Sequence, residues 1–394
     1  MLRRALATFV LCLVLLGAGI YLGGHPGGLP GFIRNPLVGD QDTRVVGEAI
    51  DRVHDTYYRP VPRAELANRS IRGIVASLHD RFSNYFDPQQ YKSFRRQQSG
   101  EYAGVGIGVV PDPMGLRVIE VYADSPARRA GVQRDDVVTA VDGRSLAGRS
   151  SDDSTKLIEG PIGTDVRLTV RRGKRTRDVT VTRATISVPV VTSRERTVGG
   201  RRLAVVRLDQ FSSGAHGELA VALRKALKDG AKGIVLDLRG NPGGLVTEAQ
   251  LVASEFLRDG KIVTTKGRSV PARTLSATGD PVAPSTPLVV LVDRGSASAA
   301  EIVAGALQDR HRAKLVGTRT FGKGVFQEVI ELSNGGALDI TAGQYFTPSG
   351  RNLGGPGTET GSGLTPDVPA ADDPKTRKVD EALNTALRTV ARAA

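Results

Sequence analysis

The chain begins with a long apolar segment. Residues 5–22 carry no charge, and two arginines precede them. A run of this length is about long enough for a helix to cross a bilayer, and basic residues on its amino side predict that the amino end stays inside while the rest is exported. A cleaved signal peptide is the alternative, but the run is longer than a usual signal core and lacks a clear small-x-small cleavage site before Gly23. We therefore predict an anchor or signal segment over residues 1–23 and a flexible, Gly- and Pro-rich spacer over residues 24–40.

Apolar residues at helical spacing characterise residues 41–100. They form two sets, which Pro60 and Pro62 separate. The first set is Val45, Val46, Ala49, Ile50 and Val53, and the second is Leu66, Ile71, Ile74, Val75 and Leu78. Apolar positions three and four residues apart lie on one face of a helix. The region is therefore predicted to be a helical hairpin that serves packing or dimerisation, which leaves a homo-oligomer open.

Short apolar runs and turns alternate over residues 101–184, which predicts a β-rich module. A strand near residues 118–121 and another near 137–141 are joined by a short helix with a glycine stop. A helix near residues 152–159 and a basic strand pair over 166–183 complete the module.

Residues 185–370 show strands that alternate with helices. The apolar runs are at 203–208, 233–238 and 287–292, and the helical patterns are at 216–229, 245–258 and 298–309. This alternation predicts an α/β layer with a largely buried sheet. A last helix is predicted over residues 371–394.

Composition and charge narrow the class of protein. A chain of 394 residues is long enough for more than one domain. Its net charge of +13 comes from Arg and Lys residues scattered in ones and twos, without the basic patch that nucleic-acid binding requires. Attraction to an anionic membrane surface is a better explanation for positive charge that is spread in this way. The single cysteine, Cys12, lies in the apolar segment, so no intrachain disulfide can form.

Two loops between a strand and a helix carry candidate chemistry. In residues 237–244 (DLRGNPGG), a glycine pair at a helix start exposes amides where the helix dipole favours negative charge. That loop is either a tight turn or half of an oxyanion hole. In residues 293–301 (DRGSASAAE), small residues would let a substrate backbone come close. A serine at a helix start is usually an N-cap. We assign that role to Ser296 and place Ser298 in the first turn, beside the amide of Ala299.

A third loop supplies a candidate base. Lys323 stands between two glycines, so no bulky neighbour prevents it from pointing inward. The five histidines offer no comparable position, since they fall in the spacer, in helical segments or in a charged turn: His25, His54, His79, His216 and His311. A Ser–Lys dyad is a recognised alternative to Ser-His-Asp.

The β-rich module resembles a PDZ domain. The resemblance is carried by the alternating glycines of residues 102–110 and by SPARRAGV followed by VVTAVDG. It implies that a peptide's C-terminus binds as an added strand, its carboxylate held by the amides of a glycine loop. Those amides would belong to Val105, Gly106 and Ile107, and Leu157 and Ile158 would line the side-chain groove. Asp135 replaces the family's usual glycine, which puts that local turn in doubt.

The three loops together resemble those of the carboxy-terminal processing proteases, also called tail-specific proteases. The resemblance covers nearly the whole exported chain. It implies an α+β multi-domain fold with a helical N-terminal region, a PDZ-like module and a crotonase/Clp-like layered α/β protease core. It also implies that Ser298 is the nucleophile, Lys323 the general base, and Gln327 the residue that orients the lysine.

The same resemblance implies an oxyanion hole. Its donors would be the amide of Gly243 or Gly244 and the amide of Ala299. Ala300 replaces a serine that is common in the family, a mild change on the nucleophile helix.

The expected function is that of an extracytoplasmic serine endopeptidase at the cell membrane, or a secreted one if the N-terminal segment is cleaved. Its partners would be proteins or peptides with free C-termini and the membrane, but not nucleic acid. No metal or organic cofactor is expected. Two alternatives are a non-catalytic, membrane-tethered PDZ scaffold and an acyl-CoA enzyme, although the latter would need neither a PDZ module nor export.

Overall fold

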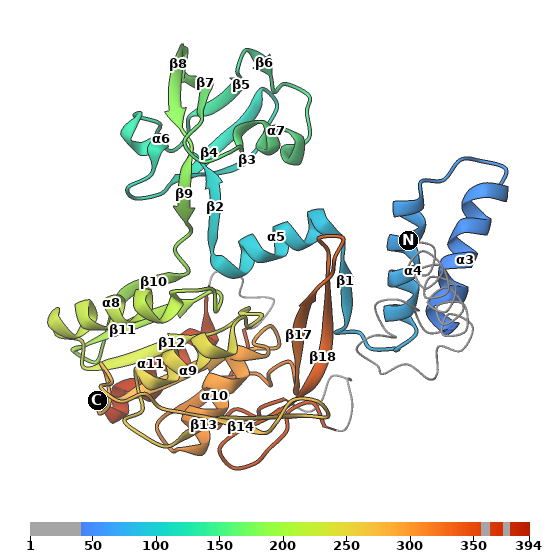
Figure 1. Ribbon diagram of the computed structural model, residues 1–394. Helices are drawn as coiled ribbons and strands as arrows, with labels where there is room; N and C mark the ends of the chain where they lie inside the picture. The colour runs from blue at the N-terminus through green and yellow to red at the C-terminus, as the bar shows by residue number, and fades with distance from the viewer. Residues whose placement is uncertain (1–40, 356–362, 373–378) are drawn as a thin grey trace, which may run out of the picture. The chain divides into compact units, whose positions relative to one another are not determined.

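The computed structural model describes residues 41–355, 363–372 and 379–394 (Figure 1). The described residues fall into two compact units, which meet in the sequence between His79 and Asp80. The predicted anchor and spacer lie outside the described residues. Within the described ranges, no helix is long and apolar enough to cross a membrane.

The first unit contains both predicted helices, α3 (Gln41–Thr56) and α4 (Arg63–Ala76), which pack against each other. Of their residues only Val75 is buried. Seven large apolar side chains of this unit remain exposed: Val45, Val46, Val53, Tyr57, Tyr58, Ile74 and Leu78. His79 follows α4 in a turn with a φ of 51°, so it lies outside the helix in which the sequence pattern placed it.

The second unit begins with two elements that the sequence pattern did not predict. These are the short strand β1 (Asn84–Phe86) and helix α5 (Pro88–Ser99). The helix starts at a capping box, in which the Asp87 side chain accepts from the Gln89 and Gln90 amides while the Gln90 side chain accepts from Asp87 N. It ends at Gly100, which has a φ of 68°. Because α5 is almost entirely polar, hydrophobic periodicity gave no sign of it.

The β-rich module follows α5. Strand β2 (Glu101–Gly104) pairs antiparallel with β9 (Ala184–Ser187), and the rest of the module lies between them in sequence. Its sheet has the order β3-β4-β5-β7-β8, with β6 paired to β5. The strands are β3 (Ile107–Asp112), β4 (Gly115–Val121), β5 (Val137–Val141), β6 (Arg144–Ser145), β7 (Asp165–Arg172) and β8 (Arg175–Thr182), and the helices are α6 (Pro126–Arg129) and α7 (Ser151–Ile158). Asp135 has a φ of 69°, the backbone conformation for which the family's usual glycine is suited. Asp tolerates this conformation better than most residues, so the turn is retained.

The core is built on a six-stranded sheet with the order β10-β11-β12-β15-β16-β19. The strands are β10 (Val191–Val198), β11 (Arg201–Leu208), β12 (Gly233–Asp237), β15 (Leu288–Val292), β16 (Lys314–Gly317) and β19 (Val368–Pro369). Only the β10–β11 pair is antiparallel. The apolar runs on β12 and β15 are buried at every residue, as expected of parallel strands covered on both faces.

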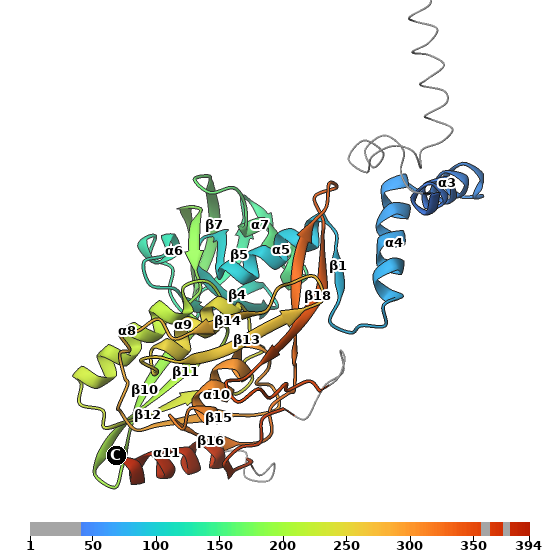
Figure 2. The same ribbon diagram turned by 60° about the horizontal axis from the view of Figure 1, so that its bottom comes forward.

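Helices cover both faces of this sheet (Figures 1 and 2). Helices α8 (Ala215–Lys228), α9 (Val246–Ser254) and α10 (Ala299–Asp309) share one apolar core with one face, and α11 (Glu381–Ala393) packs on the other. A second sheet adds β13 (Lys261–Gly267), β14 (Arg273–Ser276), β17 (Val325–Glu331) and β18 (Ala337–Phe346) to β1. The predicted multi-domain fold, with N-terminal helices, a PDZ-like module and a layered α/β core, is confirmed.

Candidate active site

Three loops follow the carboxyl ends of the neighbouring parallel strands β12, β15 and β16. Such strand ends meet at one edge of a sheet, where α/β proteins usually bind ligands. Hydrogen bonds join the loops directly, since Ala297 N donates to Asn241 O (2.9 Å) and Phe321 N donates to Ser296 O (3.0 Å). The fold therefore brings together segments that lie about 25 to 80 residues apart in the sequence.

A cavity of about 340 Å³ opens on these loops. It is lined by Ser298, Lys323 and Gln327 and by the glycines Gly243 and Gly244. Helix α5 also contributes three residues to its wall, Phe94, Gln97 and Gln98. The structure thus gathers the predicted nucleophile, base, lysine partner and one amide loop around one space.

Ser298 is the N-cap residue of α10, and its φ of 54° is unusual for a residue other than glycine. Our assignment of the cap to Ser296 is wrong. The Ser296 hydroxyl instead donates to Leu238 O (2.8 Å) and accepts from Asp293 N (2.9 Å), so it ties the two loops together. The backbone turns sharply at Ser298 because Ser296 is fixed to the neighbouring loop on one side and α10 begins on the other.

Glu301 connects the turn at Ser298 to the lysine loop. Its side chain is fully buried, and its carboxylate accepts four hydrogen bonds. One oxygen accepts from Thr320 Oγ1 (2.6 Å) and Gly322 N (2.8 Å). The other accepts from Ser298 N and Lys323 N, both at 2.9 Å. Burial raises the pKa of Glu301, and the hydrogen bonds act in the opposite direction.

Glu301 was not predicted as a site residue, although the sequence contains a signal for it. Ser298 and Glu301 have the S-x-x-E spacing of a capping box. That spacing predicts the bond from the Ser298 amide to the carboxylate. It does not predict the bonds from the lysine loop, because those depend on the tertiary fold.

The Lys323 ammonium nitrogen is held by Gln327, since Nζ donates to Gln327 Oε1 at 2.7 Å. Gln327 Nε2 in turn donates to Thr341 Oγ1 (3.1 Å) on β18, which fixes the orientation of the amide. Lys323 Nζ also lies 5.0 Å from the centre of the Phe82 ring. No pattern in the sequence around Lys323 indicates Phe82 as its neighbour.

Burial lowers the pKa of Lys323, and the charges of Asp339, Asp80 and Glu301 oppose that effect. Asp339 was also missed by the sequence analysis. It lines the same cavity, and burial raises its pKa to about 6, with Lys323 acting to lower it and Asp80 to raise it. The lysine therefore has a depressed pKa despite carboxylates nearby.

The amides of the glycine loop are not equivalent. Gly243 N donates to Asn241 Oδ1 (2.8 Å), so this amide is already occupied. A Cβ at Gly243 would lie 2.8 Å from Ala297 O, which explains the need for glycine there. Within the described part of the chain, the amides of Gly244 and Ala299 donate no hydrogen bond. Of the predicted donors, these two are available to a ligand.

In the β-rich module, the backbone of the glycine loop lies close to Ser125. Gly106 has a φ of 83°, and a Cβ there would lie 2.3 Å from Ser125 Cβ. No hydrogen bond from the Val105 or Gly106 amide to another described residue is found. The two predicted groove residues differ in solvent exposure. Ile158 is buried in the core of the module, while Leu157 remains partly exposed. Ile158 is therefore the more deeply buried of the two predicted groove residues.

Helix α7, which carries Leu157, is connected to the wall of the cavity that Ser298 lines. Its C-cap residue, Glu159, pairs with Arg96 of α5 at 3.2 Å. The same α5 contributes Phe94 and Gln97 to the cavity. Helix α5 thus lines the cavity and also contacts the end of α7.

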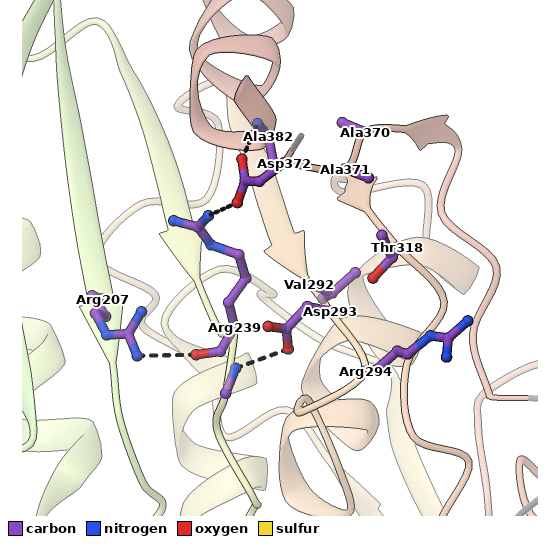
Figure 3. A pocket seen from close by; sticks show the side chains of 11 residues that line it. Arg207, Arg239, Val292, Asp293, Arg294, Thr318, Ala370, Ala371, Asp372 and Ala382 are labelled. Atoms are coloured by element: carbon purple, nitrogen blue, oxygen red, sulfur yellow. Dashed lines mark hydrogen bonds and ion pairs between the residues drawn. The ribbon is translucent and has the colours of Figure 1, made fainter. Parts of the chain in front are cut away.

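A second cavity, of about 630 Å³, is lined by the first residues of the same three loops (Figure 3). There the Arg239 side chain makes two hydrogen bonds to Asp237 and two to Asp380, and it pairs with Asp372 at 3.6 Å. Burial alone would lower the pKa of Arg239, but the carboxylates of Asp237 and Asp380 raise it above its usual value. Arg207 donates to the Arg239 carbonyl oxygen (3.1 Å). Because the arginine is matched by carboxylates, this cavity is a structural junction between the amide loop and the start of α11.

Comparison with known proteins agrees with this arrangement. Residues 117–172 match the PDZ domain, and residues 202–370 match peptidase family S41. The chain belongs to peptidase family S41. The predicted membership of the carboxy-terminal processing proteases is confirmed, and members of this family are serine-type peptidases.

Two relatives named "Probable CtpA-like serine protease" show the extent of the similarity. The chain is 36% identical over 335 residues to the one from Staphylococcus aureus (strain bovine RF122 / ET3-1), which covers 84% of this chain and 65% of the relative. It is 34% identical over 321 residues to the one from Staphylococcus haemolyticus (strain JCSC1435), which covers 81% of this chain and 64% of the relative. The chain thus spans slightly less than two thirds of the length of these relatives.

A solved structure extends the comparison to the fold. The photosystem II D1 C-terminal processing protease is 29% identical, with a TM-score of 0.50. The match covers 89% of this chain and 97% of that protein. It therefore includes the module and the core together.

Proposed function

We propose that this protein is an exported, membrane-tethered serine endopeptidase that binds substrate C-terminal tails at its PDZ domain and cleaves peptide bonds with a Ser298–Lys323 dyad. The observation that carries this proposal is the lysine held by Gln327 in the cavity that Ser298 also lines. Membership of a serine peptidase family supports the reaction class.

Lys323 acts as general base. A neutral amine has one lone pair and two N–H bonds, and one of those bonds is directed to Gln327 Oε1. The lone pair is then free to accept the proton of Ser298. To be neutral near pH 7–8, the lysine pKa must fall by about three units from its reference value, which corresponds to about 4 kcal/mol against the charged form. Burial of Lys323 acts in that direction.

The reaction has two halves. Ser298 Oγ forms a bond to the scissile carbonyl carbon, and the peptide nitrogen leaves with the proton that Lys323 received. Lys323, neutral again, then takes a proton from water, which attacks the acyl-enzyme, and returns it to Ser298 Oγ as the C–O bond breaks. The amides of Gly244 and Ala299 are the donors assigned to the oxyanion, and loss of one such donor costs about 100–1000-fold in turnover.

Tail recognition is assigned to the PDZ domain. The free carboxylate of a substrate binds the amides of Val105, Gly106 and Ile107, and the chain before it adds a strand along β3. This assignment rests on the domain match and on the two unbonded loop amides. A peptide amide in place of the carboxylate loses its charge, so its apparent KM should rise strongly while kcat stays similar.

Export and tethering are proposed from residues 1–23 alone. Extraction of cell membranes with alkaline carbonate should leave the full chain in the membrane, whereas a version lacking residues 1–23 should be released. Protease added outside intact cells or spheroplasts should degrade the catalytic part. Recovery of the full chain in the carbonate supernatant would contradict the anchor.

The catalytic proposal is tested with the full chain and an unfolded protein that has a free C-terminus. Ser298→Ala and Lys323→Arg should both be inactive, the latter because a guanidinium cannot act as a base near neutral pH. Lys266→Arg is the matched control, since Lys266 is exposed on β13. Turnover by Lys323→Arg at the wild-type rate would refute the dyad. Equal cleavage by wild type and Ser298→Ala would refute the enzyme and favour a peptide-binding scaffold.

A further inference from the structure

Asp339, on β18, is the only acidic side chain among the described residues that line the cavity with Ser298. Lys323 is the only basic one. Apart from the Ser298 hydroxyl, the other walls are apolar side chains, glycines and uncharged amides. The proposed reaction gives the lysine a role, but it makes no use of the carboxylate.

The pairing of β17 with β18 fixes the face on which this carboxylate lies. Gln327 is the partner of Thr341, and two residues further along the hairpin Val329 is the partner of Asp339. Paired residues share one face of a sheet, as do residues two apart on a strand. The bond from Gln327 Nε2 to Thr341 Oγ1 (3.1 Å) lies on this face, and the same Gln327 side chain holds Lys323. Asp339 therefore stands on the face of the lysine, about 6.7 Å along the strand from Thr341.

The Asp339 carboxylate has no counter-charge of its own. It forms no ion pair or hydrogen bond with another described residue. Burial raises its pKa to about 6, with Lys323 acting to lower it and Asp80 to raise it. Because Lys323 has to be neutral when it takes the proton of Ser298, even this partial compensation is lost in the working enzyme. A half-buried carboxylate without a cation is unfavourable, and a ligand that brings a cation relieves that cost.

The side chains around Asp339 do not supply the missing cation. Its neighbours on the two adjoining strands are Val329 on β17 and Asn84 on β1, and both are uncharged. In the segment before β1, the guanidinium of Arg81 lies over the ring of Phe82, 5.3 Å from its centre, and it forms no ion pair with Asp339. A cation for this carboxylate therefore has to come from a molecule that enters the cavity.

The cavity also suits the stem of a basic side chain. Val329, Phe94 and Phe326 contribute apolar surface to its wall. Lysine and arginine lay their methylene groups along such surface and place the charged head at a polar group. An extended peptide advances about 6.7 Å in two residues, the same step that separates Asp339 from Thr341. A substrate residue close to the cleaved bond can therefore reach the carboxylate.

We propose that Asp339 is a specificity-determining residue, whose carboxylate pairs with the cationic side chain of a lysine or arginine within about two residues of the cleaved bond. This inference rests on the proposed peptidase function. The PDZ domain would then select a substrate by its tail, and Asp339 would select the bond by a neighbouring positive charge. The pairing involves no covalent step, so the roles of Ser298 and Lys323 stay as described.

Pairs of peptides with free C-termini test this role. A bond that the wild type cuts in an unfolded protein is first identified by mass spectrometry. Peptides around this bond then carry either lysine or Nε-acetyl-lysine at each of the two positions on either side, because acetylation removes the charge and keeps the stem. At one of these positions the full-length wild type should prefer lysine about tenfold in kcat/KM, an effect between that of an exposed ion pair and that of a fully buried one. Asp339→Asn should cleave both peptides of that pair equally.

The pH dependence of the preference is a second readout. The substrate lysine stays charged near neutral pH, and titration of Lys323 changes the cleavage of both peptides alike. The ratio of their kcat/KM values should therefore follow Asp339 alone. With the pKa of Asp339 at about 6, the ratio should fall from about ten near pH 8 toward one near pH 5.

Glu328→Gln is the matched control, because it removes one carboxylate from the opposite, exposed face of the same two strands. It should keep the wild-type preference for lysine. The inference is overturned if the wild type prefers lysine at none of the positions, if Asp339→Asn keeps the preference, or if Glu328→Gln loses it too. If Ser298→Ala cleaves the peptides as fast as the wild type, the proposed peptidase function fails instead, a result that does not depend on the lysine.

Discussion

Replacement of Glu301 by Gln is the most informative single change in the site. The two side chains have the same shape, but one carboxylate oxygen becomes an NH2 group. Each of the Glu301 oxygens accepts two hydrogen bonds. In either orientation of the amide, two buried donors therefore face an NH2 group and lose their acceptor.

The size of the effect follows from the number of bonds lost. Each buried donor without an acceptor costs about 1–3 kcal/mol, so Glu301→Gln should lower the free energy of unfolding by about 2–6 kcal/mol. A domain of ordinary stability, about 5–15 kcal/mol, would still fold at moderate temperature. Because this carboxylate joins the backbone of Ser298 to that of Lys323, we expect kcat per folded molecule to fall at least about 100-fold, the scale at which small misplacements of reacting groups act.

The assay combines urea denaturation with peptide hydrolysis at a temperature where the variant is folded. Glu248→Gln is the control, since Glu248 is a buried carboxylate that accepts from the Gly214 and His216 amides and from the His216 ring. It should lose stability and keep kcat per folded molecule. If folded Glu301→Gln turns over within threefold of wild type, the carboxylate does not set the geometry of the dyad.

Three further outcomes are expected. Asp339→Asn should move the acid limb of the kcat profile to lower pH, since the Asp339 charge raises the Lys323 pKa. The same variant should be more stable than the wild type at high pH, because the pKa of Asp339 in the folded protein, about 6, is above the ordinary value. Melting across the range should show that this gain in stability is absent below about pH 4 and complete above about pH 6. Asp380→Ala should cost about 1–3 kcal/mol in urea denaturation, because Asp380 caps α11 at Leu383 N and pairs with Arg239; an unchanged midpoint would contradict this. Asp135→Gly should raise the stability of the PDZ domain by about 0.5 kcal/mol by relieving a positive φ, and a lower melting temperature would show that the Asp side chain supports the turn.

Much of the core could be predicted from the sequence because its central strands carry short, continuous apolar runs. Strands such as β12 and β15 are buried on both faces, so their sequences stand out from the amphipathic helices around them. The three loops could be found because glycine and small residues are required where backbones approach closely, as at Gly243. Local patterns of this kind are visible without knowledge of the fold.

The residues that were missed act across the fold. Phe82 reaches Lys323 from a segment about 240 residues earlier, which no local pattern indicates. Asp339 resembles any polar residue of a strand, and only burial beside the lysine distinguishes it. Likewise, the choice between the Gly243 and Gly244 amides depends on the Asn241 side chain, whose orientation belongs to the folded turn. The error at Ser296 has the same origin, because its hydroxyl bonds to Leu238 in another loop rather than to its own helix.

The antiparallel pairing of β2 with β9 makes the PDZ domain an insertion whose entry and exit coincide. Gly104 and Ala184 are paired residues, and such partners lie only about 5 Å apart. A two-residue turn could therefore close the ribbon after excision of residues 105–183, and the strands that continue into α5 and the core would keep their register. The PDZ domain is therefore a continuous insertion between the paired strands β2 and β9. Under the proposed function, exchange of residues 105–183 would change the choice of substrate and leave the cavity with Ser298 and Lys323 in place.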